Sequence, residues 1–181
     1  VVDVALDCLT GFTKPKILDI GTGSGCISIA IAKERADSDI LSVDISQDAL
    51  TKAQYNAKIN NINNVTFSKL DFMKELPDKR FDLIISNPPY ISKNEMNTIM
   101  LDVREFEPDI ALTDNHDGLE FYRRFCNTIK QLINKKGFMV LEVGLGKHPI
   151  KAYNIFHSAG FDQLELIPDY NNDLRVLKIE I

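Results

Sequence analysis

The chain has 181 residues, of which 44% are hydrophobic and 26% charged, a composition typical of one folded domain with a full core. Its net charge of −5 disfavours direct nucleic-acid binding, and no apolar stretch approaches the roughly 20 residues that span a bilayer. The three cysteines and three histidines lack metal-ligand spacing, so we predict no metal site, a reduced cytoplasmic setting, and surface or loop positions for the histidines, including His148.

Runs rich in Ile, Leu and Val alternate with segments of helical periodicity, which is typical of parallel strands covered on both faces. The predicted strands are Lys16 to Ile20, Ile40 to Val43, Val65 to Phe67, Phe81 to Ser86 and Phe138 to Val143. The predicted helices are Cys26 to Arg35, Asp48 to Ile59 (capped by Ser46) and Leu119 to Ile133, with Gly137 breaking the pattern before the fifth strand. This alternation predicts a doubly wound α/β sheet with right-handed crossovers.

The C-terminal part of the chain departs from this alternation. Phe161 to Ile167 and Leu174 to Ile181 are strand-like runs joined only by Pro168 to Asp173, a link too short for a helical crossover. We therefore predict an antiparallel pair at the end of a seven-stranded, mostly parallel sheet. The segment from Ser92 to Asp117 has no clear periodicity, and long loops in compact domains are commonly functional.

A glycine-rich stretch lies where the first strand should turn into the first helix, and glycine lets the backbone turn tightly and approach a ligand. Its spacing is GxGxG, whereas a dinucleotide fingerprint is GxGxxG, and Cys26 occupies the place of the third fingerprint glycine. The carboxylate of Asp19 would repel a pyrophosphate but suits an ammonium group, which favours S-adenosylmethionine over NAD. A tight turn without a ligand is the alternative. The candidate cofactor residues here are Asp19, Gly21, Thr22, Gly23, Ser24 and Gly25.

The next two predicted strands also end in residues that suit a nucleoside. Asp44 ends the second strand, where a carboxylate can accept both hydroxyls of a ribose, and Ile45 follows it as a further cofactor-binding candidate. Asp71 and Phe72 follow the third strand, where Asp71 could accept the amine of an adenine and Phe72 could cover its face. Considered singly, Asp44 could be a turn residue and Phe72 an ordinary core residue.

The tetrapeptide Asn87-Pro88-Pro89-Tyr90 directly follows the fourth strand and is the strongest functional signal in the chain. It joins a carboxamide, a rigid backbone without two amide donors, and an aromatic ring. The oxygen of Asn87 and the carbonyl of Pro88 could accept both hydrogens of a planar NH2 group while Tyr90 packs against its plane. We therefore predict catalytic and substrate-binding roles for all four residues, and a cofactor contact for Asn87. A stiff loop with a buried tyrosine is the alternative.

Together, the four strand ends resemble the class I S-adenosylmethionine-dependent methyltransferases that modify planar nitrogens, over nearly the whole chain. The tetrapeptide alone is shared by DNA adenine, ribosomal RNA guanine and protein glutamine methyltransferases. Further stretches resemble the peptide chain release factor glutamine methyltransferases, of the protein-(glutamine-N5) methyltransferase family. These are Asp102-Val103-Arg104, Phe106-Glu107-Pro108, Ala111-Leu112, Asp117-Gly118-Leu119, Leu141-Glu142-Val143-Gly144 and Arg175-Val176.

This resemblance implies a Rossmann-like class I methyltransferase catalytic domain over residues 1–181, with Arg104 and Glu107 contacting the acceptor or, alternatively, bracing the loop as a surface pair. It implies methyl transfer to the side-chain amide nitrogen of the glutamine in a Gly-Gln pair of release factors. The family normally carries a preceding helical domain. Because the chain begins at Val1 and not at methionine, we expect a fragment without that domain. The alternatives are a methyltransferase for adenine or guanine amines and a non-catalytic methyltransferase-like binding module.

Overall fold

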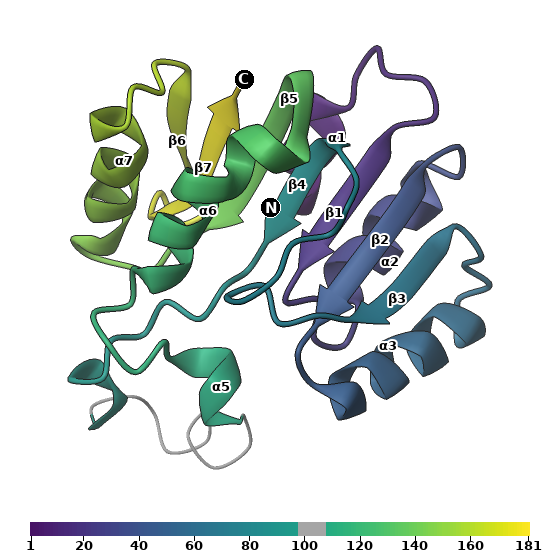
Figure 1. Cartoon of the computed structure of the whole chain (residues 1–181), viewed down its shortest axis with the longest axis horizontal. Helices are drawn as coiled ribbons and strands as arrows, with labels where there is room; N and C mark the ends of the chain where they lie inside the picture. The colour runs from purple at the N-terminus through teal and green to yellow at the C-terminus, as the bar shows by residue number, and fades with distance from the viewer. Residues whose placement is uncertain (98–107) are drawn as a thin grey trace.

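The computed structural model describes residues 1–97 and 108–181. Its centre is a seven-stranded sheet with the order β3-β2-β1-β4-β5-β7-β6 (Figure 1). The strands are β1 Lys16–Ile20, β2 Asp39–Asp44, β3 Val65–Lys69, β4 Phe81–Ser86, β5 Ile133–Glu142, β6 Leu164–Pro168 and β7 Leu174–Glu180. Strands β1 to β5 pair in parallel, whereas β7 is antiparallel to both β5 and β6. The predicted sheet with its antiparallel C-terminal pair is therefore confirmed.

The helices are α1 Val2–Cys8, α2 Cys26–Glu34, α3 Gln47–Ile59, the 3-10 helix η1 Glu95–Asn97, α5 Asp109–Leu112, α6 Glu120–Leu132 and α7 His148–Ser158. Helices α2, α3 and α6 confirm the three predicted helices to within one residue at each end. The Ser46 hydroxyl accepts the Ala49 amide at 3.2 Å, which confirms the predicted cap of α3. Among residues 1–97 and 108–181, no helix has the length and apolar character needed to cross a membrane.

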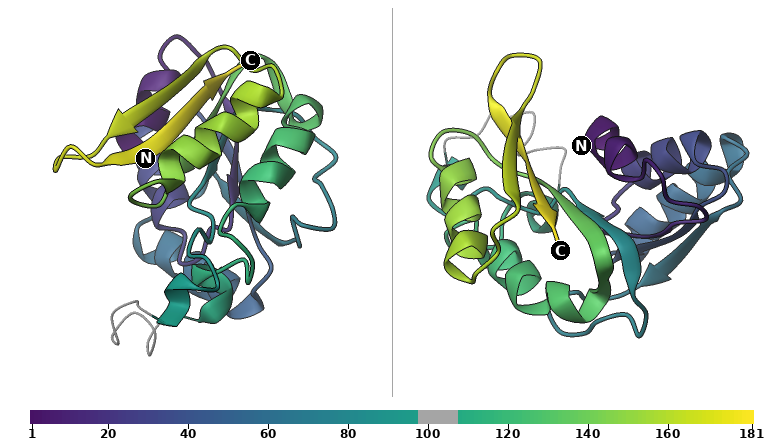
Figure 2. Two further views of the ribbon diagram at one scale, coloured as in Figure 1. Left: turned by 90° about the vertical axis from the view of Figure 1, so that its left-hand side faces the viewer. Right: turned by 90° about the horizontal axis from the view of Figure 1, so that it is seen from above.

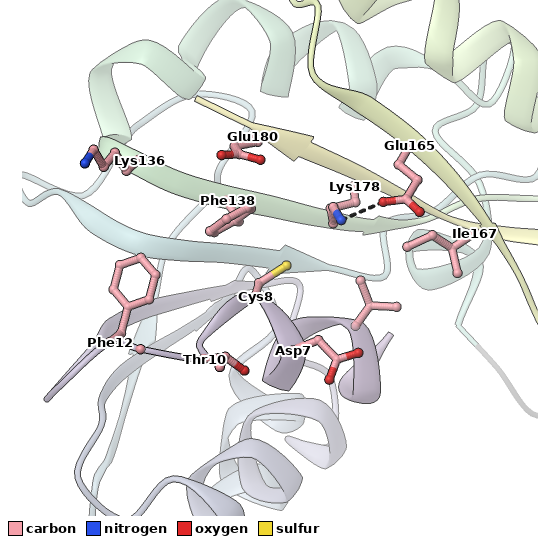
Figure 3. Close-up of a pocket in the computed structure, with 12 residues that line it drawn as sticks. Asp7, Cys8, Thr10, Phe12, Lys136, Phe138, Glu165, Ile167, Lys178 and Glu180 are labelled. Carbon is pink, nitrogen blue, oxygen red and sulfur yellow. Dashed lines mark ion pairs between the residues drawn. The ribbon is translucent and has the colours of Figure 1, made fainter.

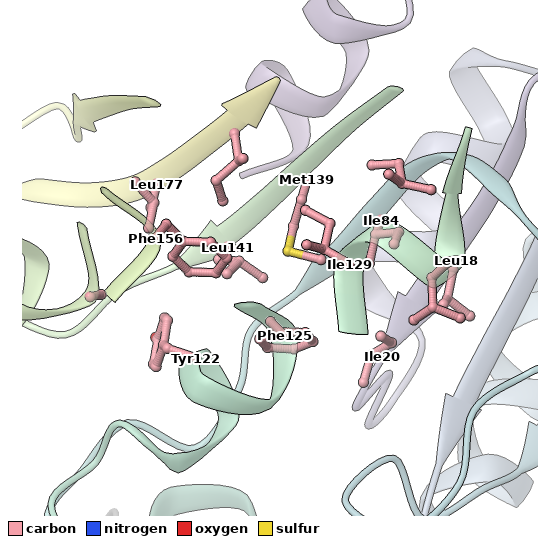
Figure 4. Packing of buried hydrophobic residues seen from close by; sticks show 14 of the residues in the cluster. Leu18, Ile20, Ile84, Tyr122, Phe125, Ile129, Met139, Leu141, Phe156 and Leu177 are labelled. Atoms are coloured by element: carbon pink, nitrogen blue, oxygen red, sulfur yellow. The ribbon is translucent and has the colours of Figure 1, made fainter. Parts of the chain in front are cut away.

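Two hydrophobic clusters cover the two faces of the sheet, because successive residues of a strand point to opposite faces. In β5, Met139 and Leu141 belong to the cluster with α6 and α7, whereas Val140 belongs to the cluster with α1 and α2. Figure 4 shows the first cluster, and the right-hand view of Figure 2 shows helices on both sides of the sheet. Burial on both faces explains why the central strands are almost continuously apolar.

The fifth strand begins earlier than predicted. Strand β5 starts at Ile133, directly after α6, so the prediction that Gly137 interrupts the chain before the strand is wrong. Lys136 adopts a φ of 64° and the register with β4 shifts at this point, so the strand passes through an irregularity without ending. A Cβ at position 137 would stand only 2.9 Å from the Asp82 carbonyl oxygen. Glycine, which has no Cβ, lets the two backbones approach this closely within the sheet.

The carboxyl ends of the parallel strands form one edge of the sheet, and strand register brings the predicted site residues together there. Ile20 of β1 pairs with Val43 of β2 on one side and with Ser86 of β4 on the other. The residues that follow these three positions are Gly21, Asp44 and Asn87. Figure 1 shows α5 beyond this edge. Ligands of open α/β sheets bind outside such strand ends, so the fold places the candidate site here.

Candidate active site

The turn between β1 and α2 has a backbone that only glycine adopts readily. Gly21, Gly23 and Gly25 have φ values of 70°, 55° and 80°, in the left-handed region where other residues are strained. The amides of Gly21 and Thr22 both donate to the Val43 carbonyl, at 2.9 and 3.1 Å. The turn is therefore fastened to the end of β2 as well as to its own strand.

The three glycines are required for different reasons. A Cβ at Gly21 or Gly23 would meet nothing within 4 Å, so these two positions present bare backbone to open space. A Cβ at Gly25 would stand 3.0 Å from the Ala53 Cβ of α3 and 3.1 Å from the Ile29 Cδ1. The first two glycines thus leave room for a ligand, and the third allows α2 and α3 to pack closely.

The Asp19 carboxylate lies beneath this turn and is almost completely buried, with 1% of its surface exposed. Its Oδ2 accepts the Thr22 hydroxyl at 2.6 Å, while its Oδ1 has no hydrogen-bond donor in the described part of the chain. Burial raises the pKa of Asp19 from 3.8 to about 6. A buried acceptor without a partner is costly in the unliganded protein, and a cationic ligand group would relieve that cost.

Asp44 ends β2 and anchors the glycine turn from the other side. Its Oδ2 accepts the Gly23 amide and its Oδ1 accepts the Ser46 amide, both at 2.8 Å. Each carboxylate oxygen can accept a second hydrogen bond, so Asp44 can still accept two ligand hydroxyls. The neighbouring Ile45 is a large apolar side chain with 39% of its surface exposed, a suitable wall for the apolar face of a nucleoside.

Asp71 and Phe72, which lie just beyond β3, differ in how deeply they are buried. Asp71 pairs with Lys74 at 2.8 Å, and this hydrogen bond lowers the pKa of the carboxyl, which keeps it an acceptor. The Phe72 ring, only 4% exposed, lies 4.9 Å from the Phe125 ring and has the Arg124 guanidinium 5.6 Å from its centre. The ring thus packs against the core residue Phe125, and the adenine contact predicted for Phe72 stays a prediction.

Asn87 stands free at the end of β4. Its side chain is exposed and forms no hydrogen bond with residues 1–97 or 108–181. Directly before it, the buried Ser86 hydroxyl donates to the Ile20 carbonyl at 2.6 Å and joins the ends of β4 and β1. Pro88, directly after it, is buried, and Pro89 and Tyr90 are half-buried. The exposed Asn87 carboxamide thus lies between two buried residues, Ser86 and Pro88.

Five residues from separate parts of the chain surround Tyr90: Gly118, Glu142, Gly144, His148 and Arg175. We call these residues the Tyr90 cluster. The stretches that resemble the release factor enzymes contain four of the five, but the sequence pattern indicates no individual role for any of them. The prediction of a surface or loop position for His148 is wrong, since it begins α7 half-buried, with its ring 5.9 Å from that of Tyr90.

The segment that follows the tetrapeptide is fastened where it leaves the sheet and where it returns. The Ile91 amide donates to the Leu112 carbonyl at 3.0 Å, and Ile91 forms a parallel bridge with Thr113. At Gly118, with φ of 79°, a Cβ would overlap the Tyr90 carbonyl, so the returning chain lies directly against the tetrapeptide. Arg104 and Glu107, predicted acceptor contacts, lie outside the described residues.

Comparison with known proteins agrees with the chemistry of this edge. The sequence profile of the methyltransferase small domain matches residues 3–104, which include the glycine turn, Asp44 and the tetrapeptide. The chain belongs to the methyltransferase small domain family.

Two relatives of this methyltransferase small domain carry the name release factor glutamine methyltransferase. The protein from Fusobacterium nucleatum subsp. nucleatum is 36% identical over 178 residues, 98% of this chain and 50% of its own length. The protein from Geobacter sulfurreducens is 37% identical over 161 residues, 89% of this chain and 56% of its own length. The chain spans about half the length of the curated relatives it matches.

The methyltransferase small domain also shares its fold with solved structures. A SAM-dependent methyltransferase from Aquifex aeolicus superimposes with a TM-score of 0.67 at 13% identity, over 99% of this chain and 87% of that one. This likeness supports the Rossmann-like fold.

A broad groove of about 980 Å³ lies away from the candidate site, between α1 and strands β5, β7 and β6 (Figure 3). Cys8 of α1 lies on one wall and Phe138 and Ile167 lie on the strands of the other, where Lys178 of β7 pairs with Glu165 of β6 at 2.6 Å. None of its lining residues belongs to the predicted site. In this methyltransferase small domain, the groove and the predicted site are therefore in different places. The side chains suited to a ligand lie at the strand ends.

The buried Asp19 should make stability depend on pH. The folded carboxyl binds its proton more tightly than the unfolded chain does, so its contribution to stability is fully present below pH 3.8 and is lost as the pH rises through about 6. We expect Asp19→Asn to remove a pH-dependent loss of about 3 kcal/mol in the free energy of unfolding.

Urea unfolding at pH 4, 5, 6 and 7 would measure this dependence. The difference in unfolding free energy between Asp19→Asn and the unchanged protein should grow in favour of the variant over this range. Asp39→Asn, which changes an exposed carboxylate at the start of β2, is the matched control and should leave the profile unchanged. Parallel profiles for Asp19→Asn and the unchanged protein would contradict the burial argument.

Proposed function

We propose that residues 1–181 form the catalytic domain of an S-adenosylmethionine-dependent protein-glutamine methyltransferase. The observation that carries this proposal is the free Asn87 carboxamide at the end of β4, next to the bare glycine turn at the end of β1. The relatives named release factor glutamine methyltransferase support glutamine as the acceptor. A Gly-Gln pair of a release factor is then the proposed substrate, and translation places the reaction in the cytoplasm.

S-adenosylmethionine supplies an electrophilic methyl group on a sulfonium sulfur, and the residues at the sheet edge fit this molecule. The open space at Gly21 and Gly23 can receive its amino-acid portion, and the unpartnered Oδ1 of Asp19 supplies negative charge for its ammonium group. The remaining lone pairs of Asp44 can accept its ribose hydroxyls. Two carboxylates around one turn also disfavour a pyrophosphate, which supports this cofactor over NAD.

The tetrapeptide would hold the acceptor amide, whose nitrogen reacts poorly. The lone pair of an amide nitrogen is delocalised into its carbonyl, so the nitrogen is a poor nucleophile. The Asn87 Oδ1 and the Pro88 carbonyl accept the two amide hydrogens, orient the nitrogen and favour its pyramidal form as positive charge develops. As the nitrogen takes the methyl group, the carbon–sulfur bond breaks and the sulfonium leaves as a neutral thioether. One of the two amide protons then passes to solvent water, which restores a neutral amide. Well-oriented intramolecular reactions gain roughly 7–11 kcal/mol from positioning alone.

Mass spectrometry of a release factor incubated with the protein and S-adenosylmethionine tests the proposal. We expect one added methyl group on the glutamine of the Gly-Gln pair, and none when that glutamine is replaced by alanine. A methyl group on another residue, or no methyl group on the release factor, would overturn the proposed substrate.

A second candidate function is methylation of an exocyclic adenine or guanine amine, which the same tetrapeptide could hold once the base is flipped out. The net charge of −5 disfavours it. Single-stranded DNA and ribosomal RNA offered beside the release factor, with cofactor labelled in the methyl group, decide between the two acceptors. Cofactor binding in a titration without transfer to any of them would favour a non-catalytic binding module.

A further inference from the structure

We propose that Arg175, held by Glu142, is a positioning residue that fixes the Tyr90 ring as one wall of the acceptor site. This inference rests on the proposed function, because it names how the acceptor amide is held at the same tetrapeptide. It adds two side chains that lie 52 and 85 residues away from Tyr90 in the sequence.

The three side chains form a closed triangle of hydrogen bonds. The Arg175 Nη2 donates both to the Tyr90 hydroxyl oxygen at 3.2 Å and to the Glu142 Oε1 at 2.9 Å. The Tyr90 hydroxyl donates in turn to the same Glu142 Oε1 at 3.4 Å. Each partner is therefore engaged by both others, and the hydroxyl has both a donor and an acceptor within reach.

The Arg175 guanidinium also lies over the Tyr90 ring, with its central carbon 5.6 Å from the ring centre. Planar guanidinium groups stack on aromatic faces, so this contact resists rotation of the ring as well as displacement of its hydroxyl. The ion pair is only about one-fifth exposed, with side-chain exposures of 22% for Arg175 and 20% for Glu142. An interaction at this depth is less screened by water than a surface pair is.

A second set of contacts involves the His148 ring, whose centre lies 5.9 Å from that of the Tyr90 ring. The His148 Nδ1 accepts the Gly144 amide at 3.1 Å, so its Nε2 carries the proton that is donated to the Gly118 carbonyl at 2.9 Å. The His148 ring also meets the rings of Tyr90 and Tyr122 edge-on. Burial lowers the pKa of His148, which favours the neutral ring that this pattern requires.

These two sets of contacts hold different parts of the structure around Tyr90. His148 joins backbone groups of the two chain segments that flank Tyr90, whereas Arg175 and Glu142 hold the Tyr90 side chain itself. Tyr90 is half-buried, so part of this residue stays accessible, three positions after the exposed Asn87. Loss of Arg175 should therefore loosen the acceptor wall without disturbing the glycine turn or Asp44, where the cofactor is proposed to bind.

The test combines steady-state kinetics with cofactor titration for Arg175→Met. We expect KM for a release factor peptide with the Gly-Gln pair to rise about 10-fold or more, since a hydrogen-bonded charged partner is lost. The dissociation constant of S-adenosylmethionine should change less than about 2-fold. Glu142→Gln retains an acceptor oxygen. Its KM for the peptide should therefore rise much less than that of Glu142→Ala. An unchanged KM, or an equal loss of cofactor affinity, would overturn the positioning role.

Lys178→Met is the matched control, because Lys178 lies on the same strand as Arg175 and pairs with Glu165 at 2.6 Å on the groove side. It should leave both KM and cofactor affinity unchanged. In a Tyr90→Phe background, Arg175→Met should have a smaller effect than in the unchanged protein, because the hydroxyl partner is already gone. Fully additive effects would contradict action through the Tyr90 hydroxyl.

Tyrosine ring NMR separates failure of this inference from failure of the proposed function. The chain has five tyrosines and no tryptophan, so the Tyr90 ring signal can be assigned by its loss in Tyr90→Phe. Arg175→Met should shift that signal and Lys178→Met should not. An unmoved signal would overturn the role of Arg175 whatever the activity is. A shifted signal in a protein that methylates no glutamine would overturn the proposed acceptor instead.

Discussion

Asn87→Ala should abolish methyl transfer while the protein stays folded and binds its cofactor. The Asn87 side chain forms no hydrogen bond with the described residues, so its removal leaves no buried partner unsatisfied. If its oxygen orients the acceptor amide, the loss in kcat should be about 10²- to 10³-fold, as when one oriented hydrogen-bonding group is removed from a reacting centre. Single-turnover transfer of a labelled methyl group measures this rate directly.

Asn60→Ala is a suitable control for this experiment. Asn60 also carries an exposed carboxamide, but it lies at the C-terminal end of α3, where its Nδ2 donates to the Asn56 carbonyl at 2.8 Å. Thermal unfolding of both variants should stay close to that of the unchanged protein. Transfer by Asn87→Ala at a rate near that of Asn60→Ala would exclude the proposed role of the tetrapeptide.

Asp44→Ala should chiefly weaken cofactor binding, with the second largest effect that we expect. The substitution removes the acceptors of the Gly23 and Ser46 amides together with those proposed for the ribose hydroxyls. Charge-assisted hydrogen bonds contribute roughly 1.5–3 kcal/mol each, so the dissociation constant should rise about 100-fold or more. Isothermal titration calorimetry with S-adenosylmethionine measures the change.

Asp39→Ala provides the comparison for that titration, because Asp39 is an exposed carboxylate at the opposite end of the same strand. Its dissociation constant should match that of the unchanged protein. Equal affinities for Asp44→Ala and Asp39→Ala would refute the assignment of Asp44 to the ribose. A lower melting temperature for Asp44→Ala alone is expected, since two turn amides lose their partners.

The sheet could be predicted almost completely, unlike helices α5 and α7, because two sequence signals mark each central strand. Its own run of Ile, Leu and Val reports burial on both faces, and a turn or helix signal such as Ser46 reports where the run ends. Gly137 misled the prediction because glycine usually interrupts a pattern, whereas here it allows a close approach to the backbone of Asp82. A close approach between distant segments has no local signal in the sequence.

Site residues at the end of a strand could be predicted from the sequence. Residues whose neighbours depend on tertiary packing could be predicted less well. Asp44 and Asn87 meet at one edge because parallel strands end together, which strand order alone implies. For Phe72, local position could not tell a nucleobase contact from burial against Phe125. Most contacts of the Tyr90 cluster join residues more than 50 positions apart, such as Tyr90 with Arg175, and spacing does not encode them.

The fastened ends of the segment after the tetrapeptide have an evolutionary consequence. Ile91 is bridged to Thr113, and Gly118 returns against Tyr90, so contacts among the described residues anchor both ends of the segment. Sequence between those anchors can be lengthened, shortened or exchanged at modest entropic cost, since loop closure depends only weakly on length. A lineage can thus change the sequence of that segment while it inherits the residues at the strand ends unchanged.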